Sequence, residues 1–233
     1  MRLSVSHRIE DGARLASVLW EFGPGWRMIS SAILGGGIGP REWVLNAQVV
    51  GGYARMDPAE HLAELAPPGP GVGMMTAASA ERYVTARDGG VEVMATVGLR
   101  VPTWAAAPEG AADPELAPER RDRAPAVSPR ETPGGDGSRF VPGTVNIVVA
   151  VPAAMTDAAL VNTVMTATEA KTQALIEAGF PCTGTASDAV CVAARTDGPA
   201  DPFGGPRSTW GARLARAVHD AVRRGAADWL ARR

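Results

Sequence analysis

Residues 142–195 read PGTVNIVVAVPAAMTDAALVNTVMTATEAKTQALIEAGFPCTGTASDAVCVAAR and decide the fold. Residues 145–151 are almost all apolar and rich in valine, which is typical of a strand buried on both faces. Residues 188–194 predict a second strand of the same kind. Between them lies a stretch without proline that begins at good N-cap residues, Thr156 and Asp157. The segment therefore predicts a strand, a helix and a strand in succession.

The predicted helix has an apolar face and a polar face when its residues are turned by about 100° per position. The apolar face carries Leu160, Val164, Ala167, Leu175 and Ala178. The polar face carries Asn162, Thr166, Glu169 and Gln173. Lys171 is the exception, because it falls in the middle of the apolar face. Its stem could cover apolar surface while the ammonium reaches water. Alternatively, the ammonium could face an anionic reacting group, or pair with Asp188 and tie the helix to the second strand.

Composition limits the classes of function that are open to this chain. Its 233 residues suffice for one sizeable core, and we expect a single domain over residues 1–233. With 23 Lys and Arg against 25 Asp and Glu, the net charge of −2 creates no bulk positive field to attract nucleic acid or an anionic membrane. The sequence shows neither a stretch of signal-peptide type nor an apolar run approaching the roughly 18–20 residues of a membrane span. We therefore expect a cytoplasmic protein with no nucleic-acid or membrane partner.

The cysteines and histidines do not indicate a metal site. Cys182 and Cys191 lack metal-ligand spacing, and the three histidines are scattered along the chain. Cys191, within VCVAA, is expected to be a small buried apolar residue. We therefore predict no metal and no cofactor held by the protein.

The remaining segments predict an α+β fold. Residues 2–9 and 13–22 form an opening hairpin, and further strands are expected at 26–38, 42–50, 72–78, 83–87 and 91–97. Asp57 can cap a short helix that begins at Pro58, and residues 210–232 predict a long amphipathic helix. We expect a mixed, largely antiparallel sheet packed against two or three helices.

Residues 105–139 differ in character from the segments on either side. They are dense in alanine, proline, glycine and charged residues and have no apolar periodicity. Such a composition cannot bury enough surface to offset the entropy of ordering the backbone. We interpret this segment as a long flexible insertion within the domain.

Several blocks along the chain carry a resemblance to a known family. NTVMTATEAKTQALIEAG (162–179) lies between GTVNIVVAV (143–151) and TGTASDAVCVAA (183–194). ISSAILGGGI, WVLNAQV and DGGVEVMATVGL precede them in the same order as in that family. These blocks resemble adenosylcobinamide amidohydrolase over most of residues 27–222, and TEAKT is the most specific piece.

The resemblance implies an enzyme of corrinoid salvage. The implied reaction hydrolyses the amide between adenosylcobyric acid and aminopropanol in adenosylcobinamide, in the cytoplasm, and feeds cobalamin biosynthesis. The implied partner is a corrinoid small molecule whose cobalt belongs to the substrate, and a homo-oligomer is compatible with it. The chain departs from the family where Ala186 and Ser187 replace Gly-Thr and where Arg207 replaces glycine. We expect these changes to affect substrate fit more than reaction class.

Amide hydrolysis requires a nucleophile, stabilisation of the oxyanion and a proton for the departing amine. The sequence contains neither a Gly-x-Ser-x-Gly elbow nor a His-Glu-x-x-His motif, which argues against a serine triad or a zinc hydrolase. The catalytic candidates within the family-like blocks are Glu169, Lys171 and Asp188. The substrate-binding candidates are Asn46, Thr144, Asn146, Asn162, Thr168, Thr185 and Ser187.

Two chemical schemes remain open at this point. In the first, Glu169 activates water while Lys171 or an asparagine amide faces the oxyanion, and burial would raise the pKa of Glu169 into the useful range. In the second, the hydroxyl of Thr144 or Thr185 attacks, and a neighbouring carboxylate or lysine takes its proton. Glu169 and Lys171 differ by about 200° around the helix, so both cannot face one pocket.

Other functions and roles stay open as well. A corrinoid-binding or transport-associated module without catalytic activity is the alternative function, and a threonine-nucleophile acyltransferase is a different enzyme class. Asn46, expected in a strand, is either a structural anchor or a contact for a substrate amide, because a buried amide must satisfy its hydrogen bonds.

Overall fold

A computed structural model of the protein describes residues 1–114, 116 and 143–232. The strands are β1 (Arg2–Glu10), β2 (Ala13–Glu21), β3 (Trp26–Ser30), β4 (Gly37–Pro40), β5 (Trp43–Gln48), β6 (Gly71–Thr76), β7 (Val84–Asp88), β8 (Val91–Val97), β9 (Val145–Ala154) and β10 (Ala189–Arg195). The helices are α1 (Pro58–Leu65), α2 (Asp157–Glu177) and α3 (Thr209–Leu230), with a short 3-10 helix at Ala80–Arg82. Most of the insertion predicted at 105–139 lies outside the described residues.

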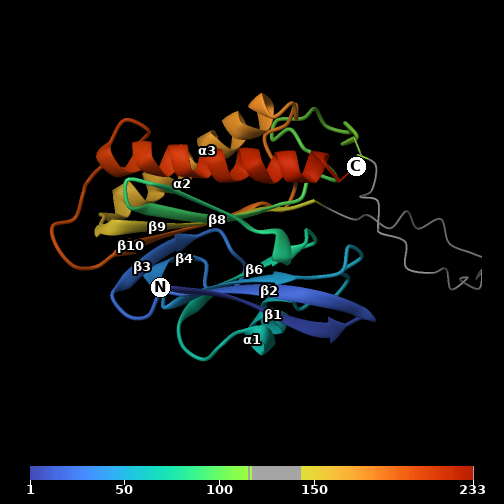
Figure 1. The fold of residues 1–233 in the computed structure, drawn as a ribbon, viewed down its shortest axis with the longest axis horizontal. Helices are drawn as coiled ribbons and strands as arrows, with labels where there is room; N and C mark the ends of the chain where they lie inside the picture. The colour runs from blue at the N-terminus through green and yellow to red at the C-terminus, as the bar shows by residue number, and fades with distance from the viewer. Residues whose placement is uncertain (115, 117–142, 233) are drawn as a thin grey trace, which may run out of the picture.

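The described strands form two stacked sheets (Figure 1). One has the order β1-β2-β5-β6 and the other the order β4-β3-β10-β9-β8-β7. Only the β5–β6 and β9–β10 neighbours within these sheets are parallel, and the other paired strands are antiparallel. The predicted α+β class, with a mixed and largely antiparallel arrangement, is therefore confirmed, and the strands divide between two sheets.

The strand–helix–strand unit predicted from residues 142–195 is present as β9, α2 and β10. The hydroxyl of Thr156 caps α2 by accepting a hydrogen bond from the Ala159 amide at 3.2 Å. After the helix, Gly179 adopts a φ of 88°, a left-handed conformation that glycine reaches without strain. Strands β9 and β10 then pair in parallel, with Asn146 opposite Ala189. Their amino-terminal ends consequently lie side by side.

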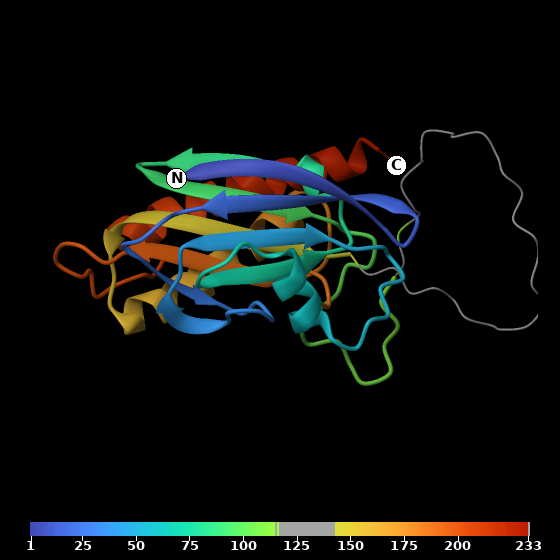
Figure 2. The same cartoon turned by 90° about the horizontal axis from the view of Figure 1, so that it is seen from below.

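Strand β9 is buried on both faces because separate layers cover the two sides of its sheet. Helices α2 and α3 pack on one face, and the four-stranded sheet packs on the other (Figure 1). Figure 2 shows the four-stranded sheet laid across the six-stranded one, with β1 nearest the β7–β8 hairpin. Helix α1 closes a smaller core on the outer side of the four-stranded sheet, formed by Trp43, Leu45, Ala47 and Leu62. The valine-rich pattern at 145–151 reflects this double burial.

One local prediction was wrong, and a second holds only in part. Residues 26–38 do not form one strand, because β3 ends at Ser30 and the chain returns as β4. Gly35 lies in this turn at a φ of 67°, where a Cβ atom would sit 1.9 Å from the carbonyl oxygen of Gly71. Helix α1 begins at Pro58 with Asp57 at the N-cap position, as predicted, but the Asp57 side chain makes no capping hydrogen bond and pairs with the Arg55 guanidinium at 2.6 Å.

None of the helices in the described ranges has the length and apolar character needed to cross a membrane.

Candidate active site

Asp188 lies immediately before β10 and accepts four hydrogen bonds. Its Oδ2 atom accepts from Lys171 Nζ at 2.5 Å and from the Thr185 amide at 3.1 Å. Its Oδ1 atom accepts from the Thr185 hydroxyl at 2.5 Å and from the Val145 amide at 2.9 Å. The ion pair that the sequence offered as one role for Lys171 is therefore present. It joins α2 to the adjacent ends of β9 and β10.

The burial of this group distinguishes it from a surface ion pair. The side chains of Lys171 and Asp188 are only 8% and 10% exposed. A buried carboxylate is tolerated when a counter-ion and hydrogen bonds replace its lost hydration. Thr185 supplies both a hydroxyl and an amide, so one loop residue provides half of the donors to Asp188. We call Lys171, Thr185 and Asp188 the charged cluster.

Gly184 makes room for the charged cluster. A Cβ atom at this position would lie 2.1 Å from Asp188 Oδ2 and 2.5 Å from Lys171 Nζ. Real Cβ atoms essentially never approach other heavy atoms so closely. The Gly-Thr dipeptide at 184–185 therefore has a steric role beside its hydrogen bonds.

Two further hydroxyls belong to residues directly before Asp188 and before Val145, whose amide bonds to Asp188. Thr144 precedes Val145, and Ser187 precedes Asp188. Their side-chain oxygens are 2.9 Å apart. Thr144 is 3% exposed, whereas Ser187 is open to solvent. The amino-terminal ends of β9 and β10 thus combine a buried carboxylate, an ammonium and three hydroxyls.

Asn46 and Asn146 form a buried bridge between the two sheets. Asn146 Nδ2 donates to Asn46 Oδ1 at 2.9 Å and to the Met75 carbonyl at 2.8 Å. Asn46 Nδ2 donates to the Thr96 hydroxyl at 2.9 Å, and the Ala189 amide donates to Asn146 Oδ1. Neither asparagine is more than 1% exposed. These contacts favour a structural anchor that holds the strand ends beneath the charged cluster.

The polar face of α2 does not join the charged cluster. Glu169 and Thr168 lie on the exposed side of the helix, along a depression of about 480 Å³ that Thr172, Gln173, Ile176 and Glu177 also line. The burial expected to make Glu169 an effective base is absent, because the helix turn that buries Lys171 points Glu169 about 200° away.

The remaining polar residues of α2 have separate partners. Thr166 is buried and donates to the Gly204 carbonyl at 3.0 Å. The partly exposed Asn162 has its amide nitrogen 3.9 Å from Met165 Sδ. Thr168 donates to the Val164 carbonyl of its own helix at 2.9 Å. Among the candidates on α2, Lys171 therefore joins the charged cluster, whereas Asn162, Thr168 and Glu169 do not.

Both cysteines are buried, as expected for Cys191. Burial raises the pKa of each thiol, that of Cys191 to about 12. A protonated thiol is a weak nucleophile. Of the nucleophilic side chains near β9 and β10, the hydroxyls are therefore better suited to attack.

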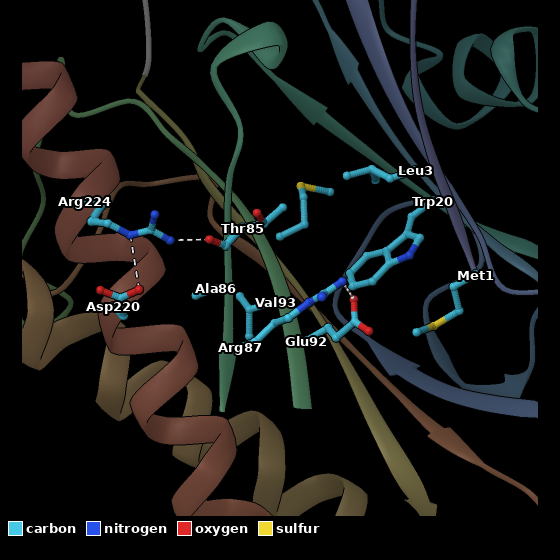
Figure 3. A pocket seen from close by; sticks show the side chains of 11 residues that line it. Met1, Leu3, Trp20, Thr85, Ala86, Arg87, Glu92, Val93, Asp220 and Arg224 are labelled. Carbon is cyan, nitrogen blue, oxygen red and sulfur yellow. Dashed lines mark hydrogen bonds and ion pairs between the residues drawn. The ribbon is translucent and has the colours of Figure 1, made fainter. Parts of the chain in front are cut away.

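A cavity of about 760 Å³ lies elsewhere, between the edge strands β1 and β7, with β8 and α3 completing it (Figure 3). Trp20 and Leu3 form an apolar wall, while Arg87 of β7 pairs with Glu92, its cross-strand neighbour on β8, at 2.9 Å. Arg224 pairs with Asp220 and donates to the Thr85 carbonyl. The predicted site residues are all described, and none of them lines this cavity. Its size alone therefore does not locate the chemistry.

The loop that follows β8 is bonded to residues 183–184, directly before Thr185 of the charged cluster, and the sequence did not predict this contact. The Thr103 amide donates to the Gly184 carbonyl at 2.8 Å, and the Thr183 amide donates to the Thr103 carbonyl at 3.0 Å. From the other side, the Thr172 hydroxyl donates to the Thr183 carbonyl at 3.2 Å. These bonds fix residues 183–184 between α2 and the loop after β8. No local pattern signals a contact between residues 80 positions apart.

Comparisons with known proteins agree with the blocks described above. A family model described as adenosylcobinamide amidohydrolase matches residues 2–233. A protein of that name from Halobacterium salinarum is 37% identical over 186 residues, covering 78% of this chain and 64% of the relative. Another from Methanosarcina mazei is 36% identical over 92 residues, covering 36% of this chain and 46% of the relative. The chain thus spans less than two thirds of the length of either relative. It belongs to the adenosylcobinamide amidohydrolase family.

Proposed function

We propose that this protein hydrolyses the amide bond between adenosylcobyric acid and aminopropanol in adenosylcobinamide. Family membership supports the reaction class, and the names of both relatives support the substrate. The released acid would return to cobalamin biosynthesis in the cytoplasm, and the cobalt would enter and leave with the substrate. The observation that carries the proposal is the 2.5 Å contact between the Thr185 hydroxyl and the carboxylate of Asp188.

Thr185 is the nucleophile in this mechanism. Its hydroxyl donates to Asp188 Oδ1, so the carboxylate is positioned to accept the proton as the oxygen attacks the amide carbon. A bond from Thr185 Oγ1 to the carbonyl carbon forms, and the carbon–nitrogen bond then breaks. The proton held by Asp188 passes to the departing aminopropanol nitrogen. Water then attacks the resulting ester and gives a proton to Asp188. Asp188 returns that proton to the Thr185 oxygen as the ester bond breaks, which releases the acid and regenerates the threonine.

Lys171 supports this chemistry electrostatically. Its ammonium lies 2.5 Å from Asp188 Oδ2, on the opposite carboxylate oxygen from the Thr185 hydroxyl. A buried positive charge stabilises the ionised carboxylate before attack and the oxyanion that develops during it. Ser187 is exposed beside the cluster and is assigned to substrate contact, with Thr144 orienting its hydroxyl. We assign no chemical step to Glu169, Thr168 or Asn162, which lie away from Asp188.

The test is incubation of the purified protein with adenosylcobinamide, followed by mass spectrometry of the products. Equal amounts of adenosylcobyric acid and aminopropanol are expected, together with an acyl adduct on the intact protein when the reaction is quenched early. Product formation without an adduct at Thr185 would contradict a threonine nucleophile. It would favour direct attack by an activated water. Tight binding of adenosylcobinamide without product would support a corrinoid-binding module instead.

A further inference from the structure

Two large apolar side chains are exposed on loops whose backbones are hydrogen-bonded to residues 183–184 and to Val190, which lie close to Thr185 and Asp188 in the sequence. Trp104 is 47% exposed and Ile33 is 57% exposed. Exposed apolar residues are ordinary when scattered singly, so their exposure alone assigns no function to these two side chains. The hydrogen bonds that position these two residues therefore require a closer description.

Trp104 is held on both sides by the segment that leads into Thr185. The residue before it, Thr103, exchanges backbone hydrogen bonds with residues 183 and 184, at 3.0 and 2.8 Å. The residue after it, Ala105, donates from its amide to the Thr183 hydroxyl at 2.8 Å. The indole thus projects from a short stretch that is fixed next to the proposed nucleophile.

The loop that carries Ile33 is held in a comparable way. Its anchor is Val190, which follows Asp188 by two residues. The Ser31 amide donates to the Val190 carbonyl at 3.1 Å, and the Val190 amide donates to the Ser31 hydroxyl at 3.1 Å. The Leu34 and Gly73 backbones also bond to each other, at 3.0 and 3.4 Å. Ile33 is therefore exposed on a loop that is anchored to β10 just beyond the charged cluster.

Resting on the function proposed above, we propose that Trp104 and Ile33 hold the corrin macrocycle of the substrate. The macrocycle is broad and largely apolar, and the amide to be cut extends from its periphery on a side chain. The ring must therefore rest beside the charged cluster while the amide reaches Thr185. An indole and a branched aliphatic side chain, both positioned before binding, suit that contact. Trp104 and Ile33 are positioning residues, because neither carries a group for the reaction.

The test compares Trp104→Ala and Ile33→Ala with Phe203→Ala, a change at another exposed apolar residue, 69% exposed in the loop before α3. For Trp104→Ala and for Ile33→Ala, KM for adenosylcobinamide is expected to rise about tenfold, while kcat stays within about twofold of wild type. The reason is that the contact stabilises the bound substrate and the transition state equally. Phe203→Ala should leave both constants unchanged. Unchanged melting temperatures would show that the variants remain folded.

Equilibrium binding of dicyanocobinamide separates this inference from the proposed reaction. This probe has the same macrocycle without the adenosyl group, and its dissociation constant can be measured whether or not turnover occurs. The dissociation constant of dicyanocobinamide is expected to rise about tenfold in both Trp104→Ala and Ile33→Ala, as KM does for the substrate. Unchanged KM and binding, or a loss confined to adenosylcobinamide, would overturn the assignment to the macrocycle. Failure of the wild-type protein to release aminopropanol would instead reject the proposed reaction.

Discussion

Lys171 Nζ lies 2.5 Å from Asp188 Oδ2, and the two residues come from α2 and from the loop that leads into β10. Lys171 is a charged residue on the apolar face of α2. Its contact with Asp188 joins the helix to the loop that carries the Thr185 and Ser187 hydroxyls. Both side chains are at most 10% exposed, so solvent does little to screen their interaction. Removing one partner therefore has a different consequence from removing both.

Lys171→Met should destabilise the fold by about 3–5 kcal/mol, because it leaves the Asp188 carboxylate buried without a counter-ion. The double variant Lys171→Met with Asp188→Asn should recover a substantial part of that loss, since no uncompensated charge remains. Unfolding in denaturant, monitored by circular dichroism, measures both values. A single variant as stable as wild type would mean that the ammonium does not compensate the carboxylate.

Thr185→Val should lower kcat/KM by at least about 100-fold, because it removes the proposed nucleophile while keeping the shape of the side chain. Thr185→Ser keeps a hydroxyl within reach of Asp188 and should retain measurable turnover and the acyl adduct. Ser187→Ala is the comparison variant, because it removes a neighbouring hydroxyl that is assigned to substrate contact and should raise KM while the acyl adduct still forms. Rapid turnover by Thr185→Val would exclude the threonine and favour water as the attacking group.

The order of the elements in the central unit was predictable because the signals are local. A run of buried valines, a threonine at the helix N-cap and a glycine after the helix each act within a few residues. The division into two sheets was not predictable, because β3 joins β10 by placing Ser30 opposite Cys191, far away in the sequence. Tertiary pairing of that kind leaves no periodic trace in either strand.

The candidate site was predictable in part for the same reason. Lys171 attracted attention because a charge interrupts an apolar face, and the structure places it against Asp188. The helical period that buries Lys171 also carries Glu169 to the exposed side. The contact between Thr103 and Gly184 is made by backbone groups, which every residue except proline carries in full, so no residue pattern signals it.

Glu169→Gln should leave kcat/KM within about threefold of wild type, because an exposed side chain on the outer face of α2 cannot reach an amide held at Thr185. Glu177→Gln, in the same surface depression, is the matched control. Steady-state kinetics with adenosylcobinamide measures both variants. A loss of 100-fold or more in Glu169→Gln alone would place this carboxylate in the reaction and restore the scheme in which it activates water.

Gly184→Ala should disrupt the charged cluster while leaving all of its polar groups in the sequence. The added methyl would lie 2.1 Å from Asp188 Oδ2, so the loop or the carboxylate must move. Overpacking of this kind costs about 1–3 kcal/mol, and the shift should separate the Thr185 hydroxyl from Asp188 and lower kcat more than it raises KM. Gly52→Ala is the control, because no atom lies within 4 Å of a Cβ there. Equal stability and kcat in the two variants would show that the close packing at residue 184 has no part in positioning the cluster.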